Sequence, residues 1–191
     1  VVSTQSTGNI YMTSVRIGFV GPSNVGKSTL AEYYTEVTPD PNFSDYNPTQ
    51  GLRILETGRK IQGIEGSVPV QIWDVSGDPQ YEMYLGKISM QLDGVVIVIP
   101  GIDLRVTQTC KKYYQLSVDE ERVGKYGFVT CLLHKHGAPV SEEVYIEDKQ
   151  LASIPVFRTC LEGDKEMIVD ALDQLVEKIA KKHQNDGEFY E

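Results

Sequence analysis

The sequence predicts an α/β protein with a mostly parallel six-stranded sheet, one antiparallel edge strand and helices on both faces. Short apolar runs alternate with helical and loop-like stretches, as they do when helices cover a sheet. The run DGVVIVIP at residues 93–100 is continuously apolar, which is expected of a strand buried on both faces. The expected strands are residues 15–20, 52–58, 68–75, 93–100, 127–133 and 154–160. The second and third of these alternate in polarity and flank a Gly-containing segment, so they predict the antiparallel hairpin.

The helices and loops follow from periodicity and from turn residues. Residues 164–183 predict the strongest helix, with apolar side chains at spacings of three and four and Asp164 as its N-cap. Residues 27–37 predict a helix after the first strand, and the short acidic stretch 138–153 predicts one weak helix. Three prolines among residues 38–50 predict a loop.

The length of 191 residues predicts one domain, which we place at residues 15–183. Residues 1–14 are expected to be a disordered tail or a vector remnant, and residues 184–191 a C-terminal tail. Eighteen basic and 27 acidic residues give a net charge of −9, which argues against nonspecific binding to nucleic acid or anionic lipid. No apolar run approaches the ~20 residues needed to cross a bilayer.

The cysteines predict an intracellular protein without a disulfide framework. Cys110, Cys131 and Cys160 are odd in number and widely spaced, and two of them lie in strand-like segments. This pattern is typical of reduced core thiols in the cytoplasm. No cysteine occurs in the last 31 residues, so we expect no C-terminal prenyl anchor.

The segment GPSNVGKST at residues 21–29 matches the phosphate-loop pattern Gly-x4-Gly-Lys-Ser between a predicted strand and a predicted helix. Such a loop directs consecutive backbone N–H groups at phosphate oxygens, and the helix dipole strengthens the field. Lys27 is predicted to bridge the terminal phosphates. The other predicted phosphate contacts are Ser23, Asn24, Val25, Gly26, Ser28, Thr29 and Gly77.

A Mg²⁺ site is predicted beside these phosphates. The hydroxyls of Ser28 and Thr49 are its expected protein ligands, and Asp74 is expected to hold a metal-bound water. Gly77 ends an Asp-x-x-Gly segment, where the missing side chain lets a backbone N–H approach the terminal phosphate. The chain has no arginine cluster of the kind found in the lid of small-molecule kinases.

These motifs resemble those of Ras/Rab-like small GTPases over about residues 15–183. The resemblance narrows to the Rab-like subunits of intraflagellar transport complex B through YNPTQGLRILE (46–56), WDVSGD (73–78), DGVVIVI (93–99), HKHG (134–137) and LEGDKEMI (161–168). It implies the P-loop NTPase fold of small GTPases, with GTP or GDP and Mg²⁺ as cofactors. It also implies docking on coiled-coil subunits of that complex, no membrane anchor, a monomer when isolated, and residence in the cytoplasm and the cilium or flagellum and its base.

The base pocket departs from the small-GTPase pattern Asn-Lys-x-Asp. His134 takes the Asn place, Lys135 is kept, and Gly137 takes the Asp place. Losing charged-acceptor hydrogen bonds of ~1.5–3 kcal/mol each is expected to weaken guanine preference. The other predicted base contacts are the ring of Phe43 and the N–H of Leu161.

The missing carboxylate of the base pocket is hypothesised to come from Glu162 or Asp164, which lie in the loop expected beside the base. Unchanged GTP affinity and GTP/ATP preference after both Glu162→Ala and Asp164→Ala would refute this hypothesis. His134 and His136 do not predict a zinc site, because no third ligand is spaced to complete one.

Hydrolysis is predicted to be slow or absent. Small GTPases usually carry a water-orienting glutamine after Asp-x-x-Gly, and this chain carries Asp78. Asp78 has no amide and adds negative charge beside a triphosphate, so no catalytic residue is assigned; Gln80 is a weak candidate.

Three functions remain open from the sequence. The chain is a nucleotide-gated binding module, a constitutive structural subunit for which nucleotide is a folding cofactor, or a low-specificity NTPase that accepts ATP as well as GTP. Tyr81 and Tyr84 follow the phosphate sensor and predict a partner surface. An equal alternative is that both rings pack internally or merely line a surface helix.

Overall fold

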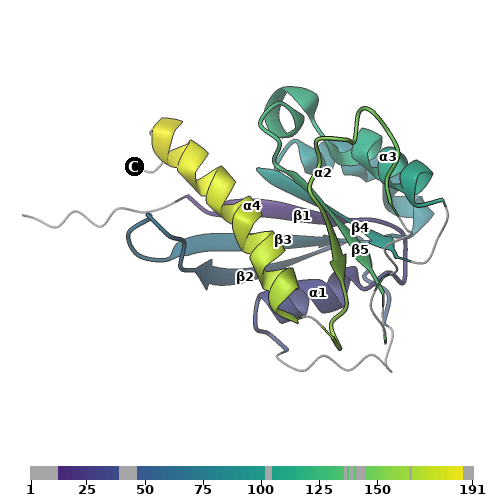
Figure 1. The fold of residues 1–191 in the computed structure, drawn as a ribbon, viewed down its shortest axis with the longest axis horizontal. Helices are drawn as coiled ribbons and strands as arrows, with labels where there is room; N and C mark the ends of the chain where they lie inside the picture. The colour runs from purple at the N-terminus through teal and green to yellow at the C-terminus, as the bar shows by residue number, and fades with distance from the viewer. Residues whose placement is uncertain are drawn as a thin grey trace, which may run out of the picture.

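The computed structural model describes residues 13–38, 47–101, 105–135, 137, 140, 145–163 and 165–186. Its helices and strands form a three-layer α/β fold in which one sheet is covered on both faces (Figure 1). The elements in chain order are β1 (Val15–Val20), α1 (Lys27–Tyr34), β2 (Leu52–Arg59), β3 (Val68–Val75), the 3₁₀ helix η1 (Pro79–Tyr84), α2 (Leu85–Ser89), β4 (Gly94–Pro100), α3 (Val106–Ser117), the π-helix η2 (Glu120–Gly124), β5 (Val129–His134), β6 (Val156–Thr159) and α4 (Lys165–Asp186).

The sheet has six strands in the order β2-β3-β1-β4-β5-β6. The β2–β3 pair is antiparallel and all the other neighbouring pairs are parallel, which confirms the predicted fold class. Every residue of β5 is buried, as are all residues of β4 except Pro100, because helices cover both faces of the central strands. The edge strand β2 has no fully buried residue and alternates between exposed and half-buried positions.

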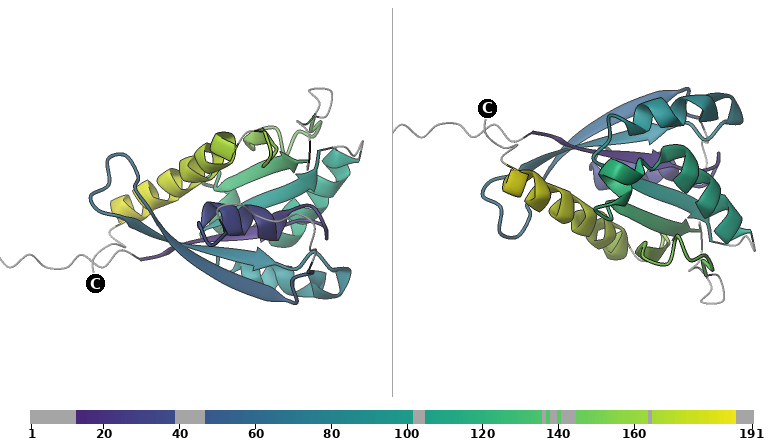
Figure 2. Two further views of the ribbon diagram at one scale, coloured as in Figure 1. Left: turned by 90° about the horizontal axis from the view of Figure 1, so that it is seen from below. Right: turned by 90° about the horizontal axis from the view of Figure 1, so that it is seen from above.

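The helices divide between the two faces of the sheet. Helices α1 and α4 contact each other on one face, where α1 packs on β1 and β3 and α4 on β5 and β6. Helices α2 and α3 contact each other, and α3 packs on β4. Figure 2 shows α4 and α2 on opposite sides of the sheet in both views.

Two helical expectations are corrected by the structure. Helix α1 ends at Tyr34 rather than at Val37, because Glu36 has a positive φ of 59° that no helix continues through. The weak helix expected in 138–153 is wrong for the part that the structure describes, where residues 145–153 are turns and irregular backbone.

Helix α3 is not among the helices that the sequence predicts. Its buried residues are Val106, Cys110, Tyr113, Tyr114 and Ser117, which do follow a helical spacing. Four of the five are Cys, Tyr or Ser, which a search for aliphatic side chains passes over.

The three cysteines are free and buried, in agreement with their prediction as core thiols. The Sγ atoms of Cys110 on α3 and Cys131 on β5 lie 3.9 Å apart across the packed helix–sheet interface. Within the described ranges, no helix has both the length and the apolar character needed to cross a membrane.

Candidate functional site

The candidate site lies at the carboxyl ends of β1 and β3. These strands are parallel neighbours, with Phe19 opposite Asp74, so the loops that follow them meet at one edge of the sheet. Strand β1 lies between β3 and β4 in the sheet. After β1 the chain forms β2 and β3 on one side of it and then crosses to β4 on the other side. Open α/β sheets bind ligands at such switch points.

The phosphate loop places Lys27 at the first position of α1. The residue is 6% exposed, and its ammonium donates a hydrogen bond to the carbonyl of Pro22, with Nζ 2.7 Å from the oxygen. Burial lowers the pKa of Lys27 to about 8, and the charge of nearby Asp74 opposes part of that shift. A cation held in this way gains stability when an anion binds against it. The loop itself turns through left-handed conformations at Asn24 and Gly26, with φ values of 59° and 89°.

Gly77 lies directly against this loop. A Cβ atom at Gly77 would lie 2.4 Å from the backbone of both Pro22 and Ser23, and 2.6 Å from Nζ of Lys27. Only a glycine therefore fits between the end of β3 and the phosphate loop. The sequence prediction that a bare backbone is needed here agrees with this packing.

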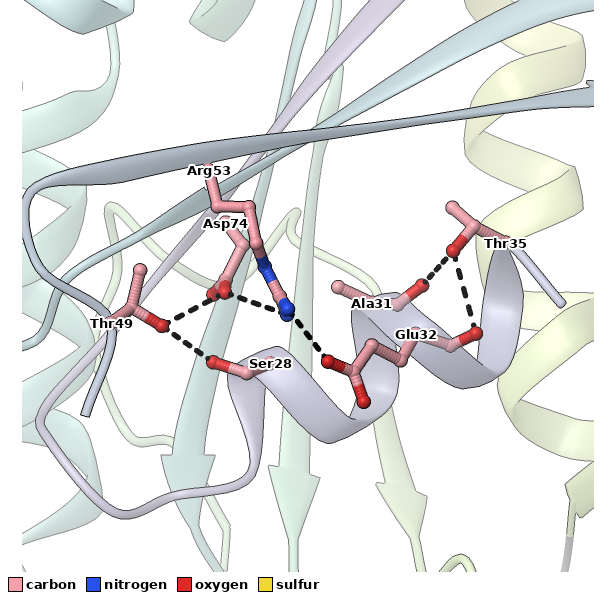
Figure 3. A network of polar contacts seen from close by, with 7 residues as sticks. All are labelled: Ser28, Ala31, Glu32, Thr35, Thr49, Arg53 and Asp74. Atoms are coloured by element: carbon pink, nitrogen blue, oxygen red, sulfur yellow. Dashed lines mark hydrogen bonds and ion pairs between the residues drawn. The ribbon is translucent and has the colours of Figure 1, made fainter. Parts of the chain in front are cut away.

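Three predicted Mg²⁺ residues are joined in one hydrogen-bond network (Figure 3). The hydroxyl oxygens of Ser28 and Thr49 lie 2.9 Å apart, and the Thr49 hydroxyl donates to Oδ2 of Asp74 at 3.0 Å. Asp74 is completely buried, and its other oxygen, Oδ1, has no hydrogen-bond partner. Two hydroxyls and a carboxylate with a spare buried oxygen are the kind of oxygen ligands that Mg²⁺ and its bound waters take, so these residues fit the ion.

Arg53 on β2 belongs to the same network, and the sequence analysis did not single it out. Its guanidinium makes an ion pair with Glu32 of α1 at 2.7 Å and another with Oδ2 of Asp74 at 3.4 Å. Arg53 lies within the stretch YNPTQGLRILE that carries the resemblance, but the resemblance implies no role for it. Only the fold brings it to both carboxylates.

Asp78 and Gln80, at the usual position of the catalytic glutamine and just after it, are bonded to each other. Oδ1 of Asp78 accepts from the backbone N–H of Gln80 at 2.9 Å, and Oδ2 accepts from the Gln80 side-chain amide at 3.1 Å. Asp78 thereby caps the N-terminus of η1. The side-chain amide of Gln80 is therefore engaged in a local cap.

The predicted base contacts are only partly described. His134 ends β5 and is 2% exposed, with its Nδ1 3.0 Å from the hydroxyl of Thr159 on β6. The Lys135 N–H donates to the carbonyl of Thr159 at 3.1 Å, and the Leu161 side chain is fully buried. Gly137 has a φ of 74° and carries no carboxylate. Phe43, His136 and Asp164 lie outside the described residues.

Glu162, the described candidate for the missing base-reading carboxylate, lies exposed beside Cys160. The Cys160 Sγ donates to Oε2 of Glu162 at 3.4 Å. Within the part of the chain that the structure describes, no three His, Cys, Asp or Glu side chains form a cluster able to hold a metal ion.

The fold is shared with solved proteins of intraflagellar transport. The GTP-bound crystal structure of T. brucei IFT22/74/81 includes a chain with a TM-score of 0.72 and 24% identity, covering 91% of this chain and 99% of that one. The GDP-bound crystal structure of T. brucei IFT22 has a TM-score of 0.66 at 24% identity, covering 90% and 99%.

Relatives with the same name are found among curated sequences. The intraflagellar transport protein 22 homolog of Bos taurus is 29% identical over 164 residues, covering 82% of this chain and 85% of the relative. The homolog of Danio rerio is 25% identical over 178 residues, covering 89% and 92%.

A family model matches the part of the chain from β1 to just after β5. Residues 16–136 match the model described as "Ras of Complex, Roc, domain of DAPkinase". The resemblance to small GTPases, and to intraflagellar transport protein 22 among them, is confirmed by these matches. Because the matched residues make up well over half of the sequence and run from β1 through β5, the chain belongs to the Roc, or Ras of Complex, family of small GTPase domains.

Proposed function

We propose that the chain binds GTP or GDP with Mg²⁺ and acts as a nucleotide-bound subunit of the intraflagellar transport particle in the cilium or flagellum. The observation that carries the nucleotide part is the buried Lys27, whose ammonium bonds to the Pro22 carbonyl, beside the Ser28–Thr49–Asp74 network. The transport part is supported by relatives named intraflagellar transport protein 22 and by the GTP-bound T. brucei IFT22/74/81 structure.

Each residue of the site has a distinct task in this proposal. Lys27 and the N–H groups of residues 23–29 neutralise and orient the phosphates, and the Gly77 N–H contacts the terminal one. The hydroxyls of Ser28 and Thr49 would hold Mg²⁺, and Asp74 would hold a metal-bound water. The ion would supply positive charge that offsets the charge of the phosphates.

Guanine preference is proposed to be weaker than in small GTPases with the full base-reading motif. Gly137 offers no side-chain acceptor to the base edge, and the His134 ring is engaged with Thr159. Leu161 is proposed to contact the base through its backbone N–H, since its side chain is fully buried. Lys135 is proposed to lay its methylene stem on one face of the base.

Intrinsic hydrolysis is expected to be on the order of 10⁻⁴ s⁻¹ or slower, the rate of small GTPases without an activator. Asp78 and Gln80 are tied to each other in the cap of η1, so neither is placed to orient water. The measurement is single-turnover hydrolysis of bound GTP without partner proteins, on wild type and on Asp78→Gln. The variant restores an amide and removes a charge, so we expect it to be faster than wild type.

Asp119→Gln is the matched control for that experiment. Asp119 caps η2 with the same bond to the N–H two residues later, at 3.0 Å, and it lies far along the chain from the phosphate loop. The control is expected to hydrolyse GTP at the wild-type rate. Turnover by wild type within seconds would overturn the proposal of a slow or inactive GTPase.

The proposed partner surface consists of exposed apolar side chains on β2 and η1: Leu52, Ile54, Met83 and Tyr84. These two segments directly follow the predicted Mg²⁺ ligand Thr49 and the phosphate sensor Gly77. They also approach each other, since a Cβ atom on Gly51 would lie 3.9 Å from the Tyr81 ring. Nucleotide-dependent ordering at either segment would therefore change the surface that coiled-coil subunits of intraflagellar transport complex B meet.

The proposal is tested by the affinity of the purified coiled-coil partners for the full chain with GTP, with GDP and without nucleotide. We expect binding to be at least about fivefold tighter with GTP than without nucleotide, a typical coupling between two sites. Tyr84→Ala is expected to weaken binding, whereas Tyr126→Ala is its matched control. The two rings are 46% and 44% exposed, and Tyr126 lies at the opposite end of the sheet, just before β5.

Three results have different meanings in that experiment. Equal affinities in all nucleotide states, with Tyr84 still required, would favour the constitutive structural subunit. Equal effects of Tyr84→Ala and Tyr126→Ala would remove the proposed surface. No binding to the coiled-coil subunits in any state would refute the transport part of the proposal.

A further inference from the structure

Arg53 occupies the border between the predicted Mg²⁺ site and solvent. Its guanidinium reaches from β2 to carboxylates on two other elements, Glu32 on α1 and Asp74 on β3 (Figure 3). Its side chain is 40% exposed, and Nε is buried without a hydrogen-bond partner. The two terminal nitrogens of the guanidinium are thus each paired with a carboxylate, and its Nε–H remains as a further donor.

The two oxygens of Asp74 are divided between different neighbours. Oδ2 accepts from both Thr49 and Arg53, at 3.0 and 3.4 Å. Oδ1 is buried and has no partner. Arg53 therefore helps to fix the orientation of the carboxylate while leaving the oxygen that a metal-bound water requires.

The charges at this site explain why a fixed cation matters. Asp74 is completely buried, and Arg53 is the one cationic side chain in the described residues within ion-pair distance of it. Nucleotide phosphates that bind without a metal ion are repelled by the part of the Asp74 charge that Arg53 does not neutralise. Phosphates that arrive with Mg²⁺ bring their own compensation, and the guanidinium then repels the ion.

We propose that Arg53 is a resident cation of the nucleotide site that lowers the dependence of nucleotide binding on Mg²⁺. Arg53 acts through Asp74 and is a positioning residue rather than a metal ligand. The inference rests on the proposed nucleotide-binding function. It assigns a role to a residue outside the recognised phosphate and metal motifs.

The test measures the dissociation constant of a fluorescent N-methylanthraniloyl-GDP for the full chain in excess Mg²⁺ and in excess EDTA. The readout is the ratio of the EDTA value to the Mg²⁺ value. For Arg53→Gln, which keeps hydrogen-bond donors but removes the charge, we expect this ratio to be about tenfold higher than in wild type. Arg53→Lys keeps the charge and is expected to restore a ratio close to that of wild type.

Arg16→Gln is the matched control. Arg16 makes a two-bond pair with Asp93 through Nε and Nη2, at 3.1 and 3.0 Å, at the end of the sheet opposite the phosphate loop. Its loss is expected to reduce stability without changing the ratio. Circular dichroism and thermal unfolding of each variant show whether it is folded under the binding conditions.

Arg53→Met supplies an independent variant if Arg53→Gln does not fold. It removes the charge and keeps a long unbranched side chain, so we expect a rise in the ratio similar to that for Arg53→Gln. Ratios within twofold of wild type for the folded Arg53→Gln, or for Arg53→Met in its place, would overturn the role of Arg53 while leaving the proposed function intact. An equal rise for Arg16→Gln would also overturn it. Failure of wild type to bind the probe in either buffer would overturn both.

Discussion

Replacement of Lys27 by alanine is expected to weaken GTP and GDP binding by about 10²–10⁴-fold, the loss of two charge-assisted hydrogen bonds of ~1.5–3 kcal/mol each. Lys27 is the buried cation of the phosphate loop, and in the described structure its Nζ is held only by the Pro22 carbonyl. The nucleotide phosphates are proposed to replace the Pro22 carbonyl as hydrogen-bond acceptors of that ammonium. Titration of the full chain with a fluorescent GDP in Mg²⁺ measures the change.

The same substitution is expected not to reduce the stability of the nucleotide-free protein. The pKa of Lys27 is lowered from 10.5 to about 8 by burial, so its charged form is disfavoured in the folded state at every pH below 8. The associated cost is about 3 kcal/mol at pH 7, and it disappears as the pH rises above the unfolded value. Alanine removes this cost, although it also loses the packing of the lysine stem and a cation near Asp74.

Lys181→Ala is the control for the Lys27 experiment. Lys181 pairs with Glu177 one turn earlier on α4, and its side chain is 51% exposed. We expect unchanged nucleotide affinity and a stability change of a few tenths of a kcal/mol at most, as for other exposed helix pairs. Nucleotide binding by Lys27→Ala within threefold of wild type would contradict the assignment of the phosphate loop.

The sheet was predictable because its strands carry local signals. The run at 93–100 is apolar on both faces, and the hairpin that contains β2 and β3 is marked by alternation and by glycines between its strands. Helix α3 was not predictable in the same way, since Cys110, Tyr113 and Tyr114 supply most of its buried face. These side chains are compatible with core, surface or turn positions, and only packing against β4 decides between them.

The residues of the candidate site also fall into those that the sequence predicts and those that it does not. Lys27, Ser28, Asp74 and Gly77 were predictable because each occupies a fixed place in a short motif beside a strand. Arg53 lies within the quoted stretch at residues 46–56, but nothing in that stretch assigns it a partner. The two carboxylates that it contacts, Glu32 and Asp74, each lie 21 residues away in the sequence. The Asp78–Gln80 cap was also missed, although an Asp before a proline at the start of a helical turn is a familiar N-terminal signal.

Replacement of Gly77 by alanine is expected to weaken GTP binding by about 100-fold or more, since overpacking costs ~1–3 kcal/mol and a lost bond to a charged phosphate ~1.5–3 kcal/mol. The new Cβ would lie 2.4 Å from the backbone of Pro22 and Ser23, which cannot rotate away as a flexible side chain does. Gly77 is not among the glycines with positive φ, so the effect arises from space rather than from backbone conformation. The phosphate loop and the end of β3 must move apart to admit the methyl group.

Gly86→Ala distinguishes this steric effect from a general effect of alanine. Gly86 lies in α2, its added Cβ would meet no atom within 4 Å, and alanine favours a helix over glycine by about 1 kcal/mol. The control is therefore expected to bind nucleotide normally and to unfold at the same or a higher temperature. Because the Gly77 N–H is proposed to contact the terminal phosphate, Gly77→Ala is expected to lose more affinity for GTP than for GDP. An equal loss for both nucleotides would mean that the methyl group disturbs the phosphate loop as a whole and that Gly77 does not sense the third phosphate.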